Sequence, residues 1–236
     1  MLAYLKNKKI LIIVAHPDDE IIGIGATINK LINDCNSSVK CLILGEGITS
    51  RDISRNLNFR AKDLEKHQKN TISAKKIIGY SELSTYNFPD NRFDTIPLLD
   101  IIKVIENEKK IFSPDIVFTH HGGDLNIDHQ ITNRAVITAT RPLEDETVKS
   151  IITFETFSGT ELQASNHPEK FSPNFFISHN KNQIDLKIRA MESYFFEKRR
   201  FPHPRSPESM LNRAKFWGST IGTNYAEAFQ IIRMID

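Results

Sequence analysis

The first half of the chain alternates between short apolar runs and segments whose apolar residues recur at helical spacing. Residues 9–15 (KILIIVA) form a continuous run rich in Ile and Val, as expected of a strand buried on both faces. The succession repeats, with helices expected at about 21–32, 59–79, 96–109 and 129–140 and further strands at 39–44, 82–88 and 115–119. This alternation predicts an α/β fold: a Rossmann-like three-layer sandwich around a doubly wound, mostly parallel sheet.

The second half is less regular. Strands are expected at 150–157 and 174–177, a helix at 184–197, a Pro-punctuated loop at 201–207, and short helical pieces at 211–217 and 226–229. The sequence contains no internal repeat, low-complexity stretch or convincing linker. We therefore expect one domain spanning residues 1–236.

The composition limits the kinds of metal site and partner. Eight of the 236 residues are His and only two are Cys, Cys35 and Cys41, which excludes a disulfide scaffold and a Cys-rich zinc module. Any transition metal would therefore be bound by His and carboxylates. The formal net charge of +2 provides no basic footprint for nucleic acid.

The sequence also gives expectations about location. The longest apolar run, residues 10–15, is too short to cross a bilayer, and the first residues lack the apolar core and cleavage site of a signal peptide. We expect a cytoplasmic protein without a membrane span. A monomer and a homo-oligomer both remain open.

The first chemically distinctive motif is His-Pro-Asp-Asp-Glu at residues 16–20. It lies where the first expected strand ends and a helix begins, the edge at which open α/β sheets bind ligands. Three carboxylates and an imidazole in five residues are costly to place together unless a cation lies among them. The alternative is an Asp-rich helix start, with Asp18 and Asp19 serving the helix dipole.

The second motif, HHGGDLNIDH at residues 120–129, follows the strand expected at 115–119. It brings three His and two Asp to the same sheet edge. Its two Gly residues allow the backbone to approach a ligand closely. The alternative is a capping Asp128 with surface His residues. If the two strands are neighbours, the two motifs face each other.

Residue types suggest how such a site would work. A hydrolytic zinc site takes three N/O ligands and leaves a position for water, and His16, Asp19 and His129 would fit. Asp18 is the candidate to take a proton from water, since it lies next to a ligand. Other divalent ions remain open, because His and Asp accept several metals.

The sequence AHPDDE at 15–20, followed by DLNIDH at 124–129, resembles the PIG-L/LmbE-like family of zinc-dependent de-N-acetylases. The segments PDIVFTH at 114–120 and AEAF at 226–229 extend the resemblance over essentially the whole chain. The resemblance implies an enzyme that removes acetyl groups from N-acetylglucosamine-type sugars. It also implies His16, Asp19 and His129 as zinc ligands, Asp18 as general base, and Asp128 as a partner that orients an imidazole.

Asn126 departs from the family pattern. Many members carry a His at this position, to which an acid or oxyanion-stabilising role is assigned. Asn can donate a hydrogen bond to an oxyanion but cannot protonate a leaving amine. The acid role would then fall to protonated Asp18, to His120 or to His121.

Three stretches, at 120–129, at 154–155 with 158–161, and at 202–206, resemble a branch of the family associated with bacterial surface-sugar biosynthesis. The implied partner is an N-acetylated sugar, free or as a sugar nucleotide, whose phosphates would need cationic donors. The candidate substrate contacts are Glu46, His121, Arg141, His203 and Arg205, with Arg92 weaker.

Several other residues are given no functional role. We expect His67, His167 and His179 at the surface and the charged run at 197–200 at a solvated helix end. We expect Trp217 in the core. Residues around Arg51 and Arg55 are expected in a polar loop that could form a lid.

Two other functions remain open: an amidase acting on a sugar–thiol conjugate, and a sugar-binding module with a vestigial site. A nucleotide-binding dehydrogenase is excluded because no Gly-x-Gly-x-x-Gly follows the first strand.

Overall fold

The computed structural model describes residues 2–236 and is built around one sheet of seven strands. The order across the sheet is β3-β2-β1-β4-β5-β7-β6, and β7 is antiparallel to both of its neighbours. The expected mostly parallel α/β fold is therefore confirmed. The strands are β1 (Lys9–Val14), β2 (Ser38–Gly45), β3 (Glu82–Phe88), β4 (Ile116–His120), β5 (Ser150–Phe154), β6 (Phe175–Ser178) and β7 (Ala226–Met234).

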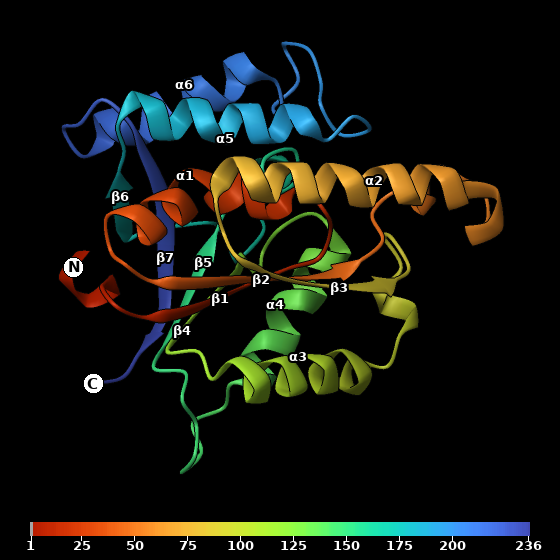
Figure 1. Cartoon of the computed structure of the whole chain (residues 1–236), viewed down its shortest axis with the longest axis horizontal. Helices are drawn as coiled ribbons and strands as arrows, with labels where there is room; N and C mark the ends of the chain where they lie inside the picture. Colours follow the sequence, from red (N-terminus) through yellow and green to blue (C-terminus); the bar gives the residue numbers. More distant parts are fainter. Residues whose placement is uncertain (1) are drawn as a thin grey trace.

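Helices cover both faces of the sheet and make the three layers visible in Figure 1. Helices α1, α2, α5 and α6 lie on one face, and α3 and α4 lie on the other. Their bounds are α1 (Asp19–Asn33), α2 (Leu57–Ile78), α3 (Leu98–Phe112), α4 (Ile127–Ala139), α5 (Lys181–Ser193) and α6 (Pro207–Thr220). Short 3-10 helices lie at Leu2–Leu5, Thr49–Arg51, Phe93–Thr95 and Thr160–Leu162.

Strand β1 shows why its sequence is apolar at every position. Ile10, Ile12 and Val14 belong to the hydrophobic core under α1, and the alternate residues Leu11 and Ile13 belong to the core under α3 and α4. Successive side chains of a strand point to opposite faces, so a strand between two helical layers needs apolar residues throughout.

Several element boundaries differ from those expected. Helix α4 begins at Ile127 because the Asn126 side chain caps it by accepting the Asp128 N–H. Helix α5 ends at Ser193, four residues before the expected end at 197. Helix α6 begins at Pro207 rather than at 211, because Ser206 caps it and Pro is favoured in the first turn.

The expectation of a short helix at 226–229 was wrong. These residues begin β7, which pairs with β5 on one side and β6 on the other. The alternation of Ala and Glu favours a helix locally, but the hydrogen bonds and packing of an interior strand outweigh that preference.

The chain order creates a switch point between β1 and β4. From β1 the chain proceeds to β2 and β3 on one side, and then returns to β4 on the other side of β1. Because the two strands are parallel, both end at the same edge of the sheet. Crevices of this kind are where open α/β sheets bind ligands, and both sequence motifs follow these strands.

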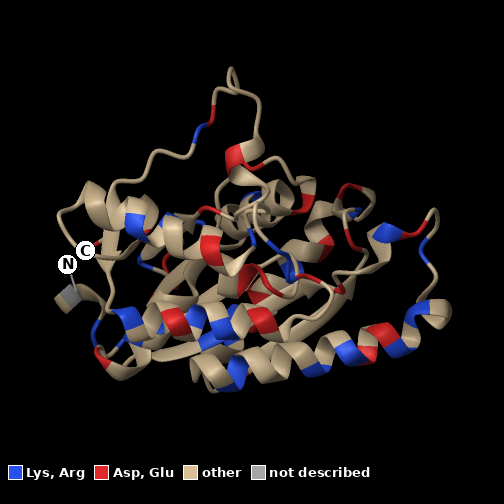
Figure 2. Ribbon diagram, turned by 90° about the horizontal axis from the view of Figure 1, so that it is seen from above, with Lys and Arg blue, Asp and Glu red and all other residues tan. Residues whose placement is uncertain are grey.

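Charges of both signs are spread over the helices, as Figure 2 shows, in keeping with a net charge of +2. Among residues 2–236, no helix is both long and apolar enough to cross a membrane.

Candidate metal centre and active site

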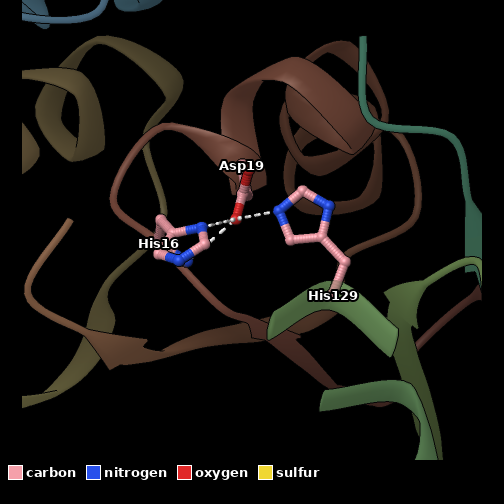
Figure 3. A group of neighbouring side chains, drawn as sticks. All are labelled: His16, Asp19 and His129. Atoms are coloured by element: carbon pink, nitrogen blue, oxygen red, sulfur yellow. Dashed lines mark hydrogen bonds and ion pairs between the residues drawn. The ribbon is translucent and has the colours of Figure 1, made fainter. Parts of the chain in front are cut away.

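Three side chains from the two motifs converge at the switch point (Figure 3). His16 follows β1, Asp19 is the first residue of α1, and His129 lies in the first turn of α4. Asp19 Oδ2 lies 3.4 Å from His16 Nδ1 and 3.3 Å from His129 Nε2. All three side chains are buried, and their possible ligand atoms lie within 4.8 Å of one another.

The spacing suits a small divalent cation. Two atoms that each lie about 2.0–2.1 Å from a tetrahedral zinc are roughly 3.3–3.4 Å apart. Within the described chain, neither ring nitrogen of the buried His129 makes a well-aligned hydrogen bond, although Asp19 lies 3.3 Å from Nε2 and Asp124 lies 3.1 Å from Nδ1. An unsatisfied buried imidazole is unfavourable, and a cation facing Nε2 would remove that cost. The residues present therefore fit zinc or a similar ion.

A buried carboxylate lies behind each of the two imidazoles. Asp128 Oδ2 lies 2.8 Å from His16 Nε2 and accepts its N–H, and Nδ1 faces Asp19. Asp124 Oδ1 lies 3.1 Å from His129 Nδ1, which leaves Nε2 facing the site. Carboxylates behind ligating imidazoles are a recurrent feature of metal sites.

Asp128 is itself held firmly. Its two carboxylate oxygens accept the backbone N–H groups of Asn91 and Phe93, at 2.6 and 2.9 Å. Asp124 accepts the N–H of Asn126 and the hydroxyl of Thr160. Asp124 was not singled out from the sequence, although it lies in the second motif.

The electrostatics favour positive charge at the centre. Burial opposes charging of His129, but Asp19 and Asp124 raise its pKa to about 9. Burial likewise opposes ionisation of Asp19, yet His129 and His120 bring the pKa of this carboxyl well below its usual value. A site that stabilises protonated imidazole in this way also suits a metal cation.

Asp18 lines the same cavity as the three converging side chains but pairs with an arginine. It is buried and its Oδ2 accepts a 2.9 Å hydrogen bond from Nη1 of Arg205. Its backbone has φ 115°, a left-handed conformation that is strained for a residue with a Cβ. Burial raises the pKa of Asp18 well above its usual value, although the charge of Arg205 opposes the shift.

His120 and His121 are engaged away from the cavity. His120 Nε2 accepts the Ala15 N–H at 2.9 Å, so Nδ1 must donate to Thr156 Oγ1. Burial, followed by the charge of His129, lowers the pKa of His120 to about 4. The His120 ring stacks on His129 with centroids 3.9 Å apart, and therefore positions it. His121 Nε2 lies 3.3 Å from the Glu169 carbonyl.

A polar cavity of about 230 Å³ opens onto the centre. Of the residues proposed from the sequence, it is lined by His16, Asp18, Asp19, Asn126, His129, His203 and Arg205. Asp128 lies behind His16. Glu46 is buried in a bidentate pair with Arg55 and does not line this cavity. Arg141 is exposed after the end of α4, beside a separate cavity.

Several residues near the site were missed or misplaced by sequence reasoning. Asp90 accepts from Ser50 and lies 3.4 Å from His16 Nε2. Glu197, expected at a solvated helix end, is buried and pairs with Arg51 and Arg205. It follows the end of α5, where the chain turns back to the cavity, and sequence periodicity carries no signal for that turn.

Two His residues expected at the surface are also buried. His67 packs against Tyr194 and Phe196, and His179 lies beside Thr27 and Glu227. His167 is partly exposed, as expected.

Known deacetylases are similar to this chain in sequence and in fold. An Escherichia coli K12 protein described as an uncharacterized deacetylase, YaiS, is 28% identical over 194 residues, which cover 80% of this chain and 91% of that protein. The solved N,N'-diacetylchitobiose deacetylase of Pyrococcus horikoshii has a TM-score of 0.75 at 21% identity, covering 98% of this chain and 86% of that one.

A further structure, the zinc-inhibited form of the teicoplanin deacetylase Orf2, has a TM-score of 0.73 at 16% identity, covering 97% of this chain and 99% of that one. At these identities the two solved structures establish the shared fold.

The family model described as PIG-L, GlcNAc-PI de-N-acetylase, matches residues 11–140. This span is more than half of the chain and contains both motifs. The resemblance found in the sequence is thereby confirmed: the chain belongs to the PIG-L family.

Proposed function

We propose that this protein is a metal-dependent amide hydrolase that removes the N-acetyl group from an amino sugar in bacterial glycan biosynthesis. The observation that carries the proposal is the buried group of His16, Asp19 and His129, with Asp18 beside it on the cavity wall. Membership of a de-N-acetylase family supports the same chemistry.

The three converging side chains would hold the cation, with zinc as the first candidate. When bound, the cation would polarise the acetamide carbonyl and stabilise negative charge on its oxygen.

Asp18 is the residue suited to proton transfer. We propose that it takes a proton from the attacking water and returns it to the leaving amine. Its raised pKa allows it to carry that proton between the two steps. His120 and His121 are less suitable, because both are engaged by neighbouring groups away from the cavity.

The remaining cavity residues would bind the sugar. Asn126 Nδ2 donates to Asn91 at the cavity wall, which orients this amide for a substrate oxygen. His203 and Arg205 come from the loop that precedes α6. We propose these three as substrate contacts, while Glu46 and Arg141 lie outside the cavity and are left out.

The test is acetate release by full-length protein stripped of metal and reloaded. Zinc is titrated from zero past one equivalent, because a zinc-inhibited form of the structurally similar Orf2 has been solved. The substrate panel contains N-acetyl sugars, sugar nucleotides and a sugar–thiol conjugate. We expect activity to rise toward one equivalent. Preference for the thiol conjugate would favour the amidase alternative, and ligand binding without turnover would favour a vestigial site.

Asp18→Asn separates the chemical role from metal binding. We expect a loss of at least about 100-fold in kcat with zinc still bound. The matched control is Asp94→Asn, because Asp94 is exposed and lies outside the site. Unchanged activity in Asp18→Asn would refute the proposed role of Asp18.

A further inference from the structure

A second cavity, of about 320 Å³, adjoins the metal cavity. Arg199 and Arg205 line both cavities, so the two are neighbours across these side chains. A substrate whose acetamide reaches the metal centre could therefore extend into the second cavity. This cavity lies between the end of α5 and the start of α6.

The wall of this cavity is strongly basic for a protein of net charge +2. Four cationic side chains line it, against one carboxylate, Glu192. The four are Lys198, Arg199, Arg200 and Arg205.

Three of these cations are available to a ligand. Arg205 is neutralised by Asp18 and Glu197. Over residues 2–236, Lys198 and Arg200 enter no ion pair, and the hydrogen bonds of the Arg199 side chain go to backbone carbonyls. An excess of unpaired cations in a concave site favours an anionic ligand, and guanidinium groups match phosphate oxygens in geometry.

The floor of the cavity is apolar. It is formed by Ile188 and Met191 of α5 and Met210 of α6. A ligand seated here would present charge to the basic wall and an organic group to the floor, as a phosphate ester does.

From these features we infer that the cavity is a phosphate subsite, and that the substrate is an N-acetyl amino sugar carrying a phosphate or diphosphate ester. The inference rests on the proposed deacetylase function. A soluble sugar nucleotide and a lipid-linked sugar phosphate share this chemistry.

The kinetic test compares kcat/KM for matched substrates of the zinc-loaded protein: methyl N-acetylglucosaminide, N-acetylglucosamine 1-phosphate and UDP-N-acetylglucosamine. We expect a phosphorylated substrate to be preferred by about tenfold or more, the effect of one charge-assisted hydrogen bond. The preference should weaken as salt is added. In the double variant Lys198→Gln/Arg200→Gln, the ratio of kcat/KM for the phosphorylated substrate to that for the neutral one should fall toward one. The change should come mainly from a higher KM for the phosphorylated substrate.

The matched control is Lys215→Gln, because Lys215 is exposed on α6 and lines neither cavity. It should keep the preference. Equal kcat/KM for neutral and phosphorylated sugars would overturn the subsite while leaving the deacetylase function intact.

A binding measurement tests the phosphate subsite independently of the proposed deacetylase function. Isothermal titration calorimetry with UDP, and cosedimentation with phosphatidylcholine vesicles containing phosphatidic acid, test the soluble and lipid sources. Binding in either arm that the double variant weakens supports the subsite, even if no acetate is released. Failure of both arms, or binding that the double variant leaves unchanged, overturns it.

Discussion

At the scale of residues, the side chains of the adjacent Asp18 and Asp19 have different environments. The strained backbone of Asp18 accompanies this difference. The left-handed φ of Asp18 turns its side chain toward Arg205, whereas Asp19 lies between the imidazoles of His16 and His129. The Asp18 carbonyl accepts the N–H groups of Ile21 and Ile22, which stabilises this turn at the start of α1. This difference is what the proposed roles require, with Asp19 as a metal ligand and Asp18 as the proton-transfer group.

Asp124 gives a test of the proposed metal centre at this scale. Asp124→Asn keeps the shape of the side chain but removes the charge that faces His129 Nδ1. We expect zinc affinity to fall by about 10–100-fold, the usual effect of losing such a partner. Competition with a chromophoric chelator measures it, with Asp94→Asn as the control. An unchanged affinity would show that Asp124 does not support the ligand.

At the scale of elements, close packing of α1 on the sheet brings Asp19 to the candidate metal centre. Gly23 of α1 faces Phe154 at the end of β5, and a Cβ at this position would lie 2.2 Å from Phe154 Cδ2. Only Gly permits this approach. One turn earlier, the same helix carries Asp19, so the packing of Gly23 and the position of the ligand are linked.

Gly23→Ala tests this packing. Ala is the better helix former by about 1 kcal/mol, but the clash with Phe154 should outweigh the gain. We expect a net loss of about 1–3 kcal/mol in the free energy of unfolding, measured with urea. Gly25→Ala is the control, because its Cβ would come no closer than 3.2 Å to another side chain, at Lys187 Cγ, against 2.2 Å at Gly23. A Gly23→Ala variant as stable as Gly25→Ala would contradict the account.

A buried ion pair joins three elements away from the metal centre. Glu227 of β7 accepts from Lys187 of α5 and from the N–H of Thr27 in α1. Burial opposes its ionisation, but Lys187 and His179 outweigh burial, and the pKa of Glu227 lies far below its usual value. A carboxyl with a depressed pKa stabilises the fold above its unfolded pKa of about 4.3 and loses that contribution as pH falls below it.

Glu227→Gln should therefore cost about 3–5 kcal/mol near pH 7, because it leaves Lys187 buried without its partner. Urea denaturation at a series of pH values measures this. The difference from the wild type should shrink as pH falls below about 4. A difference independent of pH would show that the charge of Glu227 is not what stabilises the fold.

At the scale of the whole molecule, the sequence predicted the parts of the site that follow strands directly. The motifs at 16–20 and 120–129 follow β1 and β4, and the parallel pairing of these strands brings the motifs together. Glu197 and Asp90 could not be predicted in this way, because irregular loops bring them to the cavity. The strand at β7 was missed because its stability comes from pairing with β5 and β6 rather than from local preference.

Zinc should also stabilise the whole fold, since its proposed ligands come from the end of β1 and the starts of α1 and α4. At 100 times the dissociation constant, a ligand that binds only the folded state adds about 2.7 kcal/mol to the free energy of unfolding. We expect zinc to raise the Tm of the metal-free protein, measured by calorimetry, and to leave that of His129→Ala nearly unchanged. An equal rise in both would place the bound zinc elsewhere.

The most direct test of the central claim is an anomalous difference map, collected at the zinc edge, from crystals of the zinc-loaded protein. We predict one strong peak within the described fold, bound by His16 Nδ1, Asp19 Oδ2 and His129 Nε2. A peak among His16, Asp90 and Asp128, the other buried group that could hold a metal, would contradict the account. So would the absence of a peak at His129 in protein that retains one equivalent of zinc.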